Sequence, residues 1–402
     1  MSTHAISARD TPFSNIILAV ILTGFVASTY GFGVYLFANL VVDMRRDLNF
    51  DYTTAGLITG GAQIGFLAFS FATSYISRYC QGWKISLIST LITALSLLGL
   101  SISHNVVISA VLLIILGGCS ASVYIPLAEI VTKRFPANKR ARVMGLISSG
   151  TSYGVFINGL LVSLLMSNGG WRSIWLTAGL ISLGLCLAAY FCLRNSAHAP
   201  LSQKKESGHS VVLSDAHWIS RPLWLLWIIA FLNGLTLLPF QTYLAPYMRD
   251  ELGISVQDTG LVWSTIGAVG MASGFLVGWI ADRIGARAAL IICFASACAG
   301  SLIVFTINTI PAFYIAAVFF ALAFYPIFGL VPTYIGQIVP VSRLTQAFGI
   351  ANVLIGLGGM CGNFVGGASK DTLGTFAPVY LAVALLLLLQ MLIAIILPKR
   401  SL

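Results

Sequence analysis

The chain has 402 residues, of which 58% are hydrophobic and only 8% charged, and its formal net charge is +10. Soluble domains carry roughly 25% charged residues, so this composition excludes a water-soluble enzyme or binding module and indicates an integral membrane protein. The positive charge does not indicate a nucleic-acid partner, because no stripe of interleaved basic and aromatic residues accompanies it.

Twelve long apolar runs follow one another along the chain. A membrane-spanning helix needs about 20 mainly apolar residues, whereas the strands of a membrane barrel alternate over about 10. The first run is too long for the apolar region of a cleaved signal peptide, so we expect it to remain in the mature chain. We predict an all-α integral membrane protein with helices at 14–42, 54–76, 84–102, 106–131, 142–166, 173–193, 222–247, 258–281, 288–308, 311–336, 345–369 and 375–397.

The basic residues are unevenly distributed over the predicted loops. With a cytoplasmic N-terminus, all but five of the 22 lysines and arginines fall on the cytoplasmic side. This positive-inside asymmetry predicts that both termini are cytoplasmic. Short loops without an N-x-S/T site favour a bacterial cytoplasmic membrane. The five exceptions are Arg45, Arg46, Arg172, Arg249 and Lys370.

The two halves of the chain repeat each other. A shift of 204 positions (252 minus 48) superimposes Leu48 on Leu252, Gly56 on Gly260, Pro136 on Pro340, Gly145 on Gly349 and Gly154 on Gly358. We therefore predict two six-helix bundles, 1–193 and 222–402, joined by a polar cytoplasmic linker at 194–221. The segments MRRDL (44–48) and MRDEL (248–252) also match under this shift.

Glycines recur at four-residue spacing in the second, fifth, eighth and eleventh predicted helices. Small residues at this spacing let two helices approach closely. Their recurrence in equivalent helices favours a contact along which two helices slide or rock, although static packing would account for any single ladder. The ladders are Gly61 and Gly65; Gly150 and Gly154; Gly270, Gly274 and Gly278; and Gly358, Gly362 and Gly366.

The loop after the eighth predicted helix places charges between two apolar runs. In GWIADRIGARAAL (278–290), Gly278, Asp282, Arg283 and Gly285 form the pattern G-x-x-x-D-R-x-G, followed by Arg287. This pattern resembles the cytoplasmic signature of the major facilitator superfamily, and the resemblance covers nearly the whole chain. It implies a secondary transporter whose two pseudo-symmetric bundles alternately open a central site.

The signature is interpreted as a latch on the cytoplasmic side. We expect Gly278 to let the eighth helix lie against the eleventh, with Asp282 near the N-terminus of the eleventh, where the helix dipole favours an anion by roughly 0.3–1 kcal/mol. Arg283 and Arg287 could bind this carboxylate or lipid phosphates. Such a latch would hold the outward-open state. A loop that only sets topology is the alternative.

The equivalent loop of the first half departs from the signature. Ser77 stands where the aspartate belongs, and Arg78 follows it. We expect Glu129, Arg78 and Arg142 to form a weaker latch. Apart from Asp258 at the first position of a predicted helix, Glu129 is the only acid in these helices. It is a functional candidate for that reason, with an anchoring salt bridge as the alternative.

Neutral polar side chains gather near the expected bilayer midplane, where the resemblance places the substrate between the first, fourth, seventh and tenth helices. A buried amide or hydroxyl without a partner costs about 1–3 kcal/mol, so each must bond to another helix, to water or to a solute. The candidate substrate-binding residues are Tyr30, Tyr35, Gln63, Tyr124, Tyr153, Asn158, Asn233, Gln241, Trp263, Tyr325 and Asn352.

The predicted helices hold no Lys, Arg, His or Asp near mid-depth. A phosphorylated or dianionic substrate would be expected to meet a buried cation there. We therefore expect a small neutral, zwitterionic or aromatic organic solute. A monocarboxylate bound by tyrosines stays open, with Arg172 or Lys370 near the outer mouth as distant helpers.

The direction of transport is inferred from motifs that depart from those of drug exporters. Proton-coupled exporters of the superfamily share an arginine before a glycine of helix 4, where this chain has Leu113 or Ile114, and a helix 5 motif whose proline is missing at 150–159. We favour uptake over proton-coupled export of drugs or metabolites, with a receptor that does not transport as a further alternative. If protons are coupled, the acceptor would be Glu129 or Asp43.

The histidines and cysteines show no catalytic or metal-binding spacing. The five histidines fall in predicted loops or tails, and the seven cysteines lie mainly inside apolar runs. We therefore expect no enzyme activity, no cofactor, no metal and no nucleic-acid partner. The protein is expected to be a monomer.

Overall fold

Helices make up the regular structure of the described chain. The structure is a computed structural model that describes residues 12–194 and 218–398, and no strand occurs within these ranges. The polar linker predicted at 194–221 lies mostly outside the described residues. The elements are α1 (Pro12–Val26), η1 (Ala27–Tyr35), α2 (Leu36–Leu48), α3 (Tyr52–Ile76), α4 (Gly82–Ile102), α5 (Val106–Tyr124), α6 (Leu127–Arg134), α7 (Ala137–Ser148), α8 (Gly150–Arg194), α9 (Arg221–Pro246), η2 (Tyr247–Glu251), α10 (Val256–Ile284), α11 (Ala286–Thr306), α12 (Ile310–Ile338), η3 (Val341–Arg343), α13 (Leu344–Leu373) and α14 (Ala377–Ile396).

Eleven continuous helical runs of the described chain are long and apolar enough to cross a membrane. One of them, at 142–192, has 51 residues, which is about twice the 17–25 residues that one crossing needs. It is interrupted at Gly170, where φ is 63° and ψ is −175°, a conformation that glycine adopts without steric penalty. This run therefore makes two crossings, which gives the twelve that were predicted.

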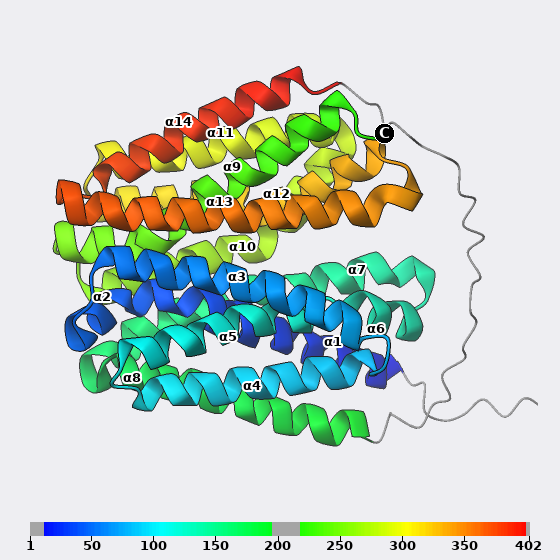
Figure 1. The fold of residues 1–402 in the computed structure, drawn as a ribbon, viewed down its shortest axis with the longest axis horizontal. Helices are drawn as coiled ribbons and strands as arrows, with labels where there is room; N and C mark the ends of the chain where they lie inside the picture. The colour runs from blue at the N-terminus through cyan, green and yellow to red at the C-terminus, as the bar shows by residue number, and fades with distance from the viewer. Residues whose placement is uncertain (1–11, 195–217, 399–402) are drawn as a thin grey trace, which may run out of the picture.

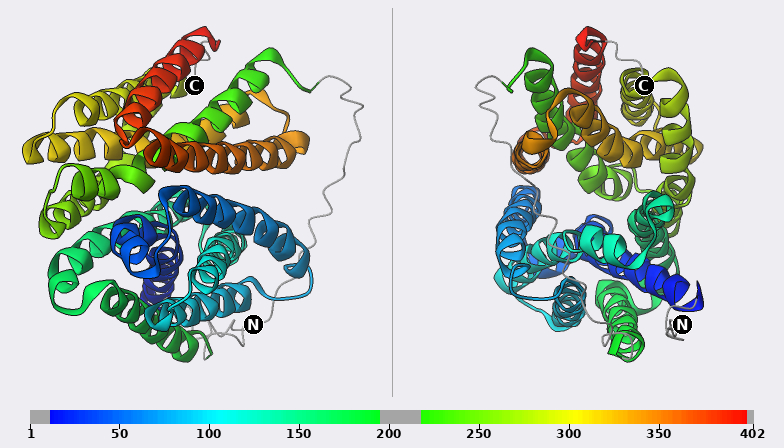
Figure 2. Two further views of the ribbon diagram at one scale, coloured as in Figure 1. Left: turned by 60° about the vertical axis from the view of Figure 1, so that its left-hand side comes forward. Right: turned by 90° about the vertical axis from the view of Figure 1, so that its right-hand side faces the viewer.

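Two groups of helices form the molecule, α1 to α8 in the lower half of Figure 1 and α9 to α14 in the upper half. Figure 2 shows the same separation from two further directions. The helices of the two bundles begin at equivalent positions: α3 and α10, α4 and α11, and α5 and α12 each start 204 residues apart (256 minus 52, 286 minus 82, 310 minus 106). The shift found in the sequence is therefore also the shift between the helix starts, and the prediction of an all-α membrane fold is confirmed.

Most glycines of the predicted ladders pack inside their own bundle. Gly65 faces α5, Gly154 faces η1, Gly270 faces α12 and Gly358 faces α9. The four equivalent helices thus use their glycines in the same way, each against a neighbour of its own bundle. In this conformation these contacts fit the static-packing alternative, whereas Gly274 and Gly278 of the third ladder have no neighbour within 4 Å.

Other glycines form the contact between the bundles, where α3 meets α13 and α8 meets α10. A side chain at Gly56 of α3 would strike the carbonyl group of Asn363 of α13. On the other side of the molecule, Gly159 of α8 lies against Gly260 of α10. The backbones approach closely at both places because no side chain intervenes.

Both contacts end toward the linker end of the molecule, which we define as the end where α8 finishes and α9 begins. Gly267 of α10 packs against α8, whereas Gly274 and Gly278, about two and three turns further along the same helix face, have nothing within 4 Å. On α13, Gly356 contacts α3, but Gly349 of the same face has no neighbour within 4 Å. The bundles therefore touch at one end and diverge at the linker end.

The pairing of helices corrects one prediction about the signature loop. The principal neighbours of α10 are α8 and α12, whereas those of α13 are α9 and α3. The expectation that Gly278 brings the eighth helix against the eleventh is therefore wrong. The spacing of the glycines indicated a smooth face but could not indicate which helix would cover it.

Candidate functional site

A small pocket lies between the two bundles, and we call it the inter-bundle pocket. Its volume is about 40 Å³, and one water needs roughly 10–15 Å³ of such space. The predicted residues Tyr35, Gln63 and Gln241 lie together here. The full lining is Val34, Tyr35, Ala38, Thr59, Ala62, Gln63, Leu238, Gln241, Thr242 and Asn363.

The amide of Gln241 has no hydrogen-bond partner within the described chain. The residue is only 2% exposed, and neither its Oε1 nor its Nε2 is bonded. The Oδ1 of Asn363, which lines the same pocket, is also unpaired. Because a buried polar group without a partner costs about 1–3 kcal/mol, a solute or water that bonds to these atoms would be stabilised in this pocket.

A π-helical segment of the first membrane helix carries part of this site. Segments of this kind often occur at functional sites. Within η1, Gly31 packs against Gly154, and its carbonyl accepts a hydrogen bond from Nδ2 of Asn158 at 2.6 Å. Tyr35 ends the segment and packs edge-on against Phe324 of the second bundle, with ring centroids 6.0 Å apart. No sequence pattern predicted this segment, although its two glycines, at 31 and 33, are consistent with it.

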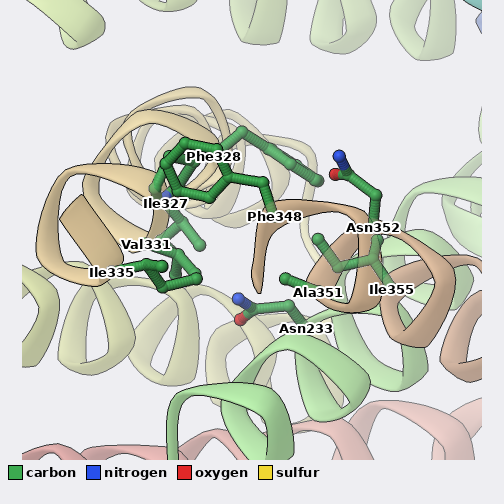
Figure 3. A pocket seen from close by; sticks show the side chains of 10 residues that line it. Asn233, Ile327, Phe328, Val331, Ile335, Phe348, Ala351, Asn352 and Ile355 are labelled. Atoms are coloured by element: carbon green, nitrogen blue, oxygen red, sulfur yellow. The ribbon is translucent and has the colours of Figure 1, made fainter. Parts of the chain in front are cut away.

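A larger pocket lies inside the second bundle and is shown in Figure 3; we call it the second-bundle pocket. Its volume is about 130 Å³, and α9, α12 and α13 alone line it. Asn233 places its amide on the floor, where the side chain is 1% exposed and Oδ1 is unpaired. Asn352 lies at the exposed rim. The structure thus separates these two predicted residues from the three at the inter-bundle pocket.

The other predicted residues line neither pocket. The Tyr124 hydroxyl lies 3.1 Å from that of Ser148, and Tyr30 packs edge-on against the Tyr124 ring, with centroids 6.0 Å apart. Trp263 is fully buried. In this conformation the residues outside both pockets are Tyr30, Tyr124, Tyr153, Asn158, Trp263 and Tyr325.

Reciprocal ion pairs join the bundles at the end opposite the linker, which we call the ion-pair end. Arg249 donates to both carboxylate oxygens of Asp43, at 2.5 and 2.8 Å. Asp250, which is 8% exposed, pairs with Arg46 at 2.5 Å and with Arg45 at 3.3 Å. These residues lie in or beside the matching MRRDL and MRDEL segments, so the repeat in the sequence contained a signal for this contact. Asp43, one of the two candidate proton acceptors, is held by Arg249 in this conformation.

A carboxylate of the second bundle also caps a helix of the first. Asp371, near the end of α13, accepts hydrogen bonds from the Thr53 amide at 2.6 Å, the Thr53 hydroxyl at 2.7 Å and the Tyr52 amide at 3.3 Å. The Tyr52 hydroxyl donates to Asp250. A carboxylate at a helix N-terminus satisfies free N–H groups and interacts favourably with the helix dipole. This contact was not predictable from the sequence, because it joins residues more than 300 positions apart.

The two cations expected as distant helpers are paired within their own bundles. Arg172 donates to Asp47 at 2.5 Å, and Lys370 donates to Glu251 at 2.9 Å. Asp47 and Glu251 are equivalent under the shift of 204 (251 minus 47). In this conformation both cations are therefore held away from the two pockets.

The residues of the signature loop lie apart from the first bundle. The Arg283 guanidinium stacks 3.4 Å from the centroid of the Trp279 ring, and Arg287 donates to the Ile395 carbonyl at 2.5 Å. Asp282 is exposed. Gly285 ends α10 with φ at 88°, a value that favours glycine. The latch remains a prediction, because the helix ends that it would join are separated here.

Of the first-bundle latch residues, Glu129 lies near the start of α4. A side chain at Gly82 would come within 3.5 Å of the Glu129 carboxylate. Arg78 and Arg142 are both exposed. Their expected contact with Glu129 also remains a prediction.

Comparison with known families agrees with this architecture. A family model described as "Major Facilitator Superfamily" matches residues 21–328 and 226–401. The chain belongs to this superfamily. The superfamily comprises membrane transporters and is not a class of enzymes, as the names of the relatives below also indicate.

Curated relatives of this superfamily member are named as transporters. Monocarboxylate transporter 12 of Xenopus laevis is 24% identical over 285 residues, which cover 64% of this chain and 61% of the relative. SauU of Cupriavidus necator, named a probable sulfoacetate transporter, is 23% identical and matches 58% of each chain. The hexuronate transporter of Bacillus subtilis is 24% identical over 60% of this chain and 58% of the relative. The matches therefore span about three fifths of these relatives.

Solved structures of the superfamily share the fold over nearly the full length. The nucleoside transporter NupG superimposes with a TM-score of 0.72 at 12% identity, covering 96% of this chain and 100% of NupG. A bacterial homolog of the human lysosomal transporter Spinster, described as inward-facing and unoccupied, has a TM-score of 0.73 at 14% identity, covering 96% of each chain. The predicted superfamily fold is therefore confirmed.

Proposed function

We propose that this chain carries a small organic solute with at most one negative charge across the membrane by alternating access. The observation that carries the proposal is the unpaired, buried Gln241 amide at a pocket that both bundles line. Membership of a transporter superfamily supports it. A solute bound at this place contacts both bundles, so rocking of one bundle against the other changes its access to either side.

The lining of the inter-bundle pocket supports a limit on the charge of the solute. The pocket is lined by amides, hydroxyls and apolar groups, with no charged side chain. Neutral donors poorly replace the hydration of a dianion. The relatives named for monocarboxylates, hexuronate and sulfoacetate favour an organic acid. Among these classes a monocarboxylate fits the uncharged pocket best, with a neutral or zwitterionic solute as the second candidate.

The distribution of basic residues supports an orientation for this conformation. The positive-inside rule places the linker end in the cytoplasm and the ion-pair end outside. The bundles touch at the ion-pair end and diverge at the linker end, so we propose that this is the inward-open form of an uptake carrier in a bacterial cytoplasmic membrane. We also propose that transport is coupled to protons and that the carrier acts as a monomer.

A substitution in the inter-bundle pocket tests the proposed function. We expect Gln241→Leu to raise the solute concentration for half-maximal uptake about tenfold, because the lost amide bonds are worth about 1–3 kcal/mol. The measurement is uptake into proteoliposomes of labelled acetate, lactate, benzoate and alanine, with sulfoacetate and muconate as dianions.

The matched control is Gln390→Leu, which removes an amide bonded to Thr236 inside the second bundle. It should leave the half-maximal concentration unchanged. Preferred uptake of a dianion, or equal effects of the two substitutions, would contradict the proposed site.

The predicted latch can be tested in the same vesicles. We expect Asp282→Asn to lower turnover two- to fivefold, because closure of the linker end would bring this carboxylate to a helix N-terminus of the first bundle, an interaction worth roughly 0.3–1 kcal/mol. Asp258→Asn, at the opposite end of the same helix, is the control and should leave turnover intact. Undiminished turnover of Asp282→Asn would remove the latch.

A further inference from the structure

The second-bundle pocket has a buried floor and a partly exposed rim. Asn233, Val331 and Ala351 are at most 5% exposed, whereas Phe328 and Asn352 are exposed at the rim. Figure 3 shows the amide of Asn233 beside the space between the side chains of α12 and α13. The pocket therefore has one polar side chain, Asn233, at its buried floor and is accessible at its rim.

The equivalent place in the first bundle is filled. Under the shift of 204, Ala351 corresponds to Ile147 (351 minus 147), and Ile147 is fully buried in a hydrophobic cluster. Asn233 corresponds to Thr29, whose hydroxyl donates to the Phe25 carbonyl of its own helix at 2.8 Å. In the first bundle Ile147 fills the space that the smaller Ala351 leaves open in the second. The hydroxyl of Thr29 is already bonded within its own helix and needs no ligand.

The rim of the pocket is also closed by a side-chain contact in the first bundle and lacks that contact in the second. In the first bundle, Tyr124 and Ser148 lie 3.1 Å apart through their hydroxyls. Their counterparts in the second bundle are Phe328 (328 minus 124) and Asn352 (352 minus 148). Phenylalanine has no hydroxyl to form this contact, so the rim loses a bond between neighbouring helices. The pocket is therefore a property of this sequence and not a requirement of the repeated fold.

The chemistry of the lining restricts the ligand. No charged side chain lines the pocket, so a charged group would lose its hydration without compensation. The volume of about 130 Å³ is close to that of the engineered cavity of roughly 150 Å³ that binds benzene. Asn233 offers an unpaired amide oxygen. The carbonyl of Phe328 also lacks its usual intrahelical donor, because Pro332 has no N–H.

We propose that the second bundle has a ligand site of its own, which takes an uncharged ring with a hydroxyl or amide group. The ring packs against Phe348 and the aliphatic side chains of α12, and its polar hydrogen faces Asn233. This site lies within one bundle and is separate from the inter-bundle pocket, so it does not depend on the proposed function.

Photolabelling of the purified full chain tests this proposal. The probe is 4-azidobenzyl alcohol, and labelled residues are located by mass spectrometry. We expect label on α12 and α13 at the pocket, suppressed by excess benzyl alcohol. Ala351→Ile, which introduces the first-bundle residue, should lower this competed labelling about tenfold. Asn233→Thr should lower it as well.

Controls distinguish this site from the inter-bundle pocket and from failure to fold. Gln241→Leu should leave the competed labelling unchanged. All variants are checked for a monodisperse peak in gel filtration, and Ala351→Val replaces the isoleucine variant if that one aggregates. The proposal is overturned by an absence of competed label on α12 and α13, by full labelling of a folded Ala351 variant, or by equal loss in Gln241→Leu.

Discussion

Asp250→Asn is expected to separate the bundles at the ion-pair end. Asp250 is 8% exposed and pairs with Arg45 and Arg46 of the other bundle. Breaking a fully buried pair costs about 3–5 kcal/mol, and because Arg46 is 60% exposed we expect about 2 kcal/mol, or a roughly 30-fold shift in the conformational equilibrium. The measurement is amide hydrogen exchange of the peptide 49–56, whose amides at Tyr52 and Thr53 are bonded to Asp371 of the second bundle.

The control for this experiment is Asp47→Asn. Asp47 lies on α2, the helix that carries Arg45 and Arg46, and it also pairs with an arginine, but its partner Arg172 belongs to the same bundle. Exchange of the peptide 49–56 should therefore rise in Asp250→Asn and stay unchanged in Asp47→Asn. Equal exchange in the two variants would show that the ion pairs of Asp250 do not hold the bundles together.

Gly159→Leu is expected to reduce uptake more than tenfold. The new side chain would strike the Gly260 carbonyl and Ser264 of α10, and overpacking of this kind costs typically 1–3 kcal/mol, occasionally more. The bundles could then no longer close at the ion-pair end. Uptake into proteoliposomes measures the loss, and faster hydrogen exchange of the peptide 49–56 identifies its cause.

Gly274→Leu tests closure at the other end of the molecule, on the same face of α10. Gly274 has no neighbour within 4 Å in this conformation, so the leucine is tolerated here but should block closure at the linker end. We expect reduced uptake with normal exchange of the peptide 49–56. Gly184→Leu, at another exposed glycine without neighbours, is the control and should transport normally. If Gly159→Leu transports normally, the α8–α10 contact does not close the carrier.

The fold was predictable because its signals are long and repeated. Twelve apolar runs fix the crossings, and the shift of 204 reappears in the helix starts. The partners of the helices were not predictable, because a glycine ladder indicates a smooth face without indicating what covers it. The first helix was predicted to end at 42, yet α2 continues to Leu48. Charges at Asp43 and Arg45 were interpreted as a loop, whereas ion pairs with the other bundle allow them to lie in a helix.

The candidate site was predicted in its chemistry and only partly in its geometry. Neutral polar residues were expected between the bundles, and Tyr35, Gln63 and Gln241 do line a common pocket. Asn233 faces a different pocket, and Tyr153 lines neither. Depth along a helix can be read from the sequence, but the direction of a side chain depends on the rotation of that helix against its neighbours.

The exchange of partners at the ion-pair end restricts how the chain can vary. Arg45 and Arg249 occupy the same position in the two repeats, and each binds an aspartate of the opposite one. Duplication of a single ancestral unit would have supplied both arginines in one event. A reversal of charge in one repeat leaves the paired residue of the other repeat without its ion pair. These positions are therefore expected to change together when a lineage diverges.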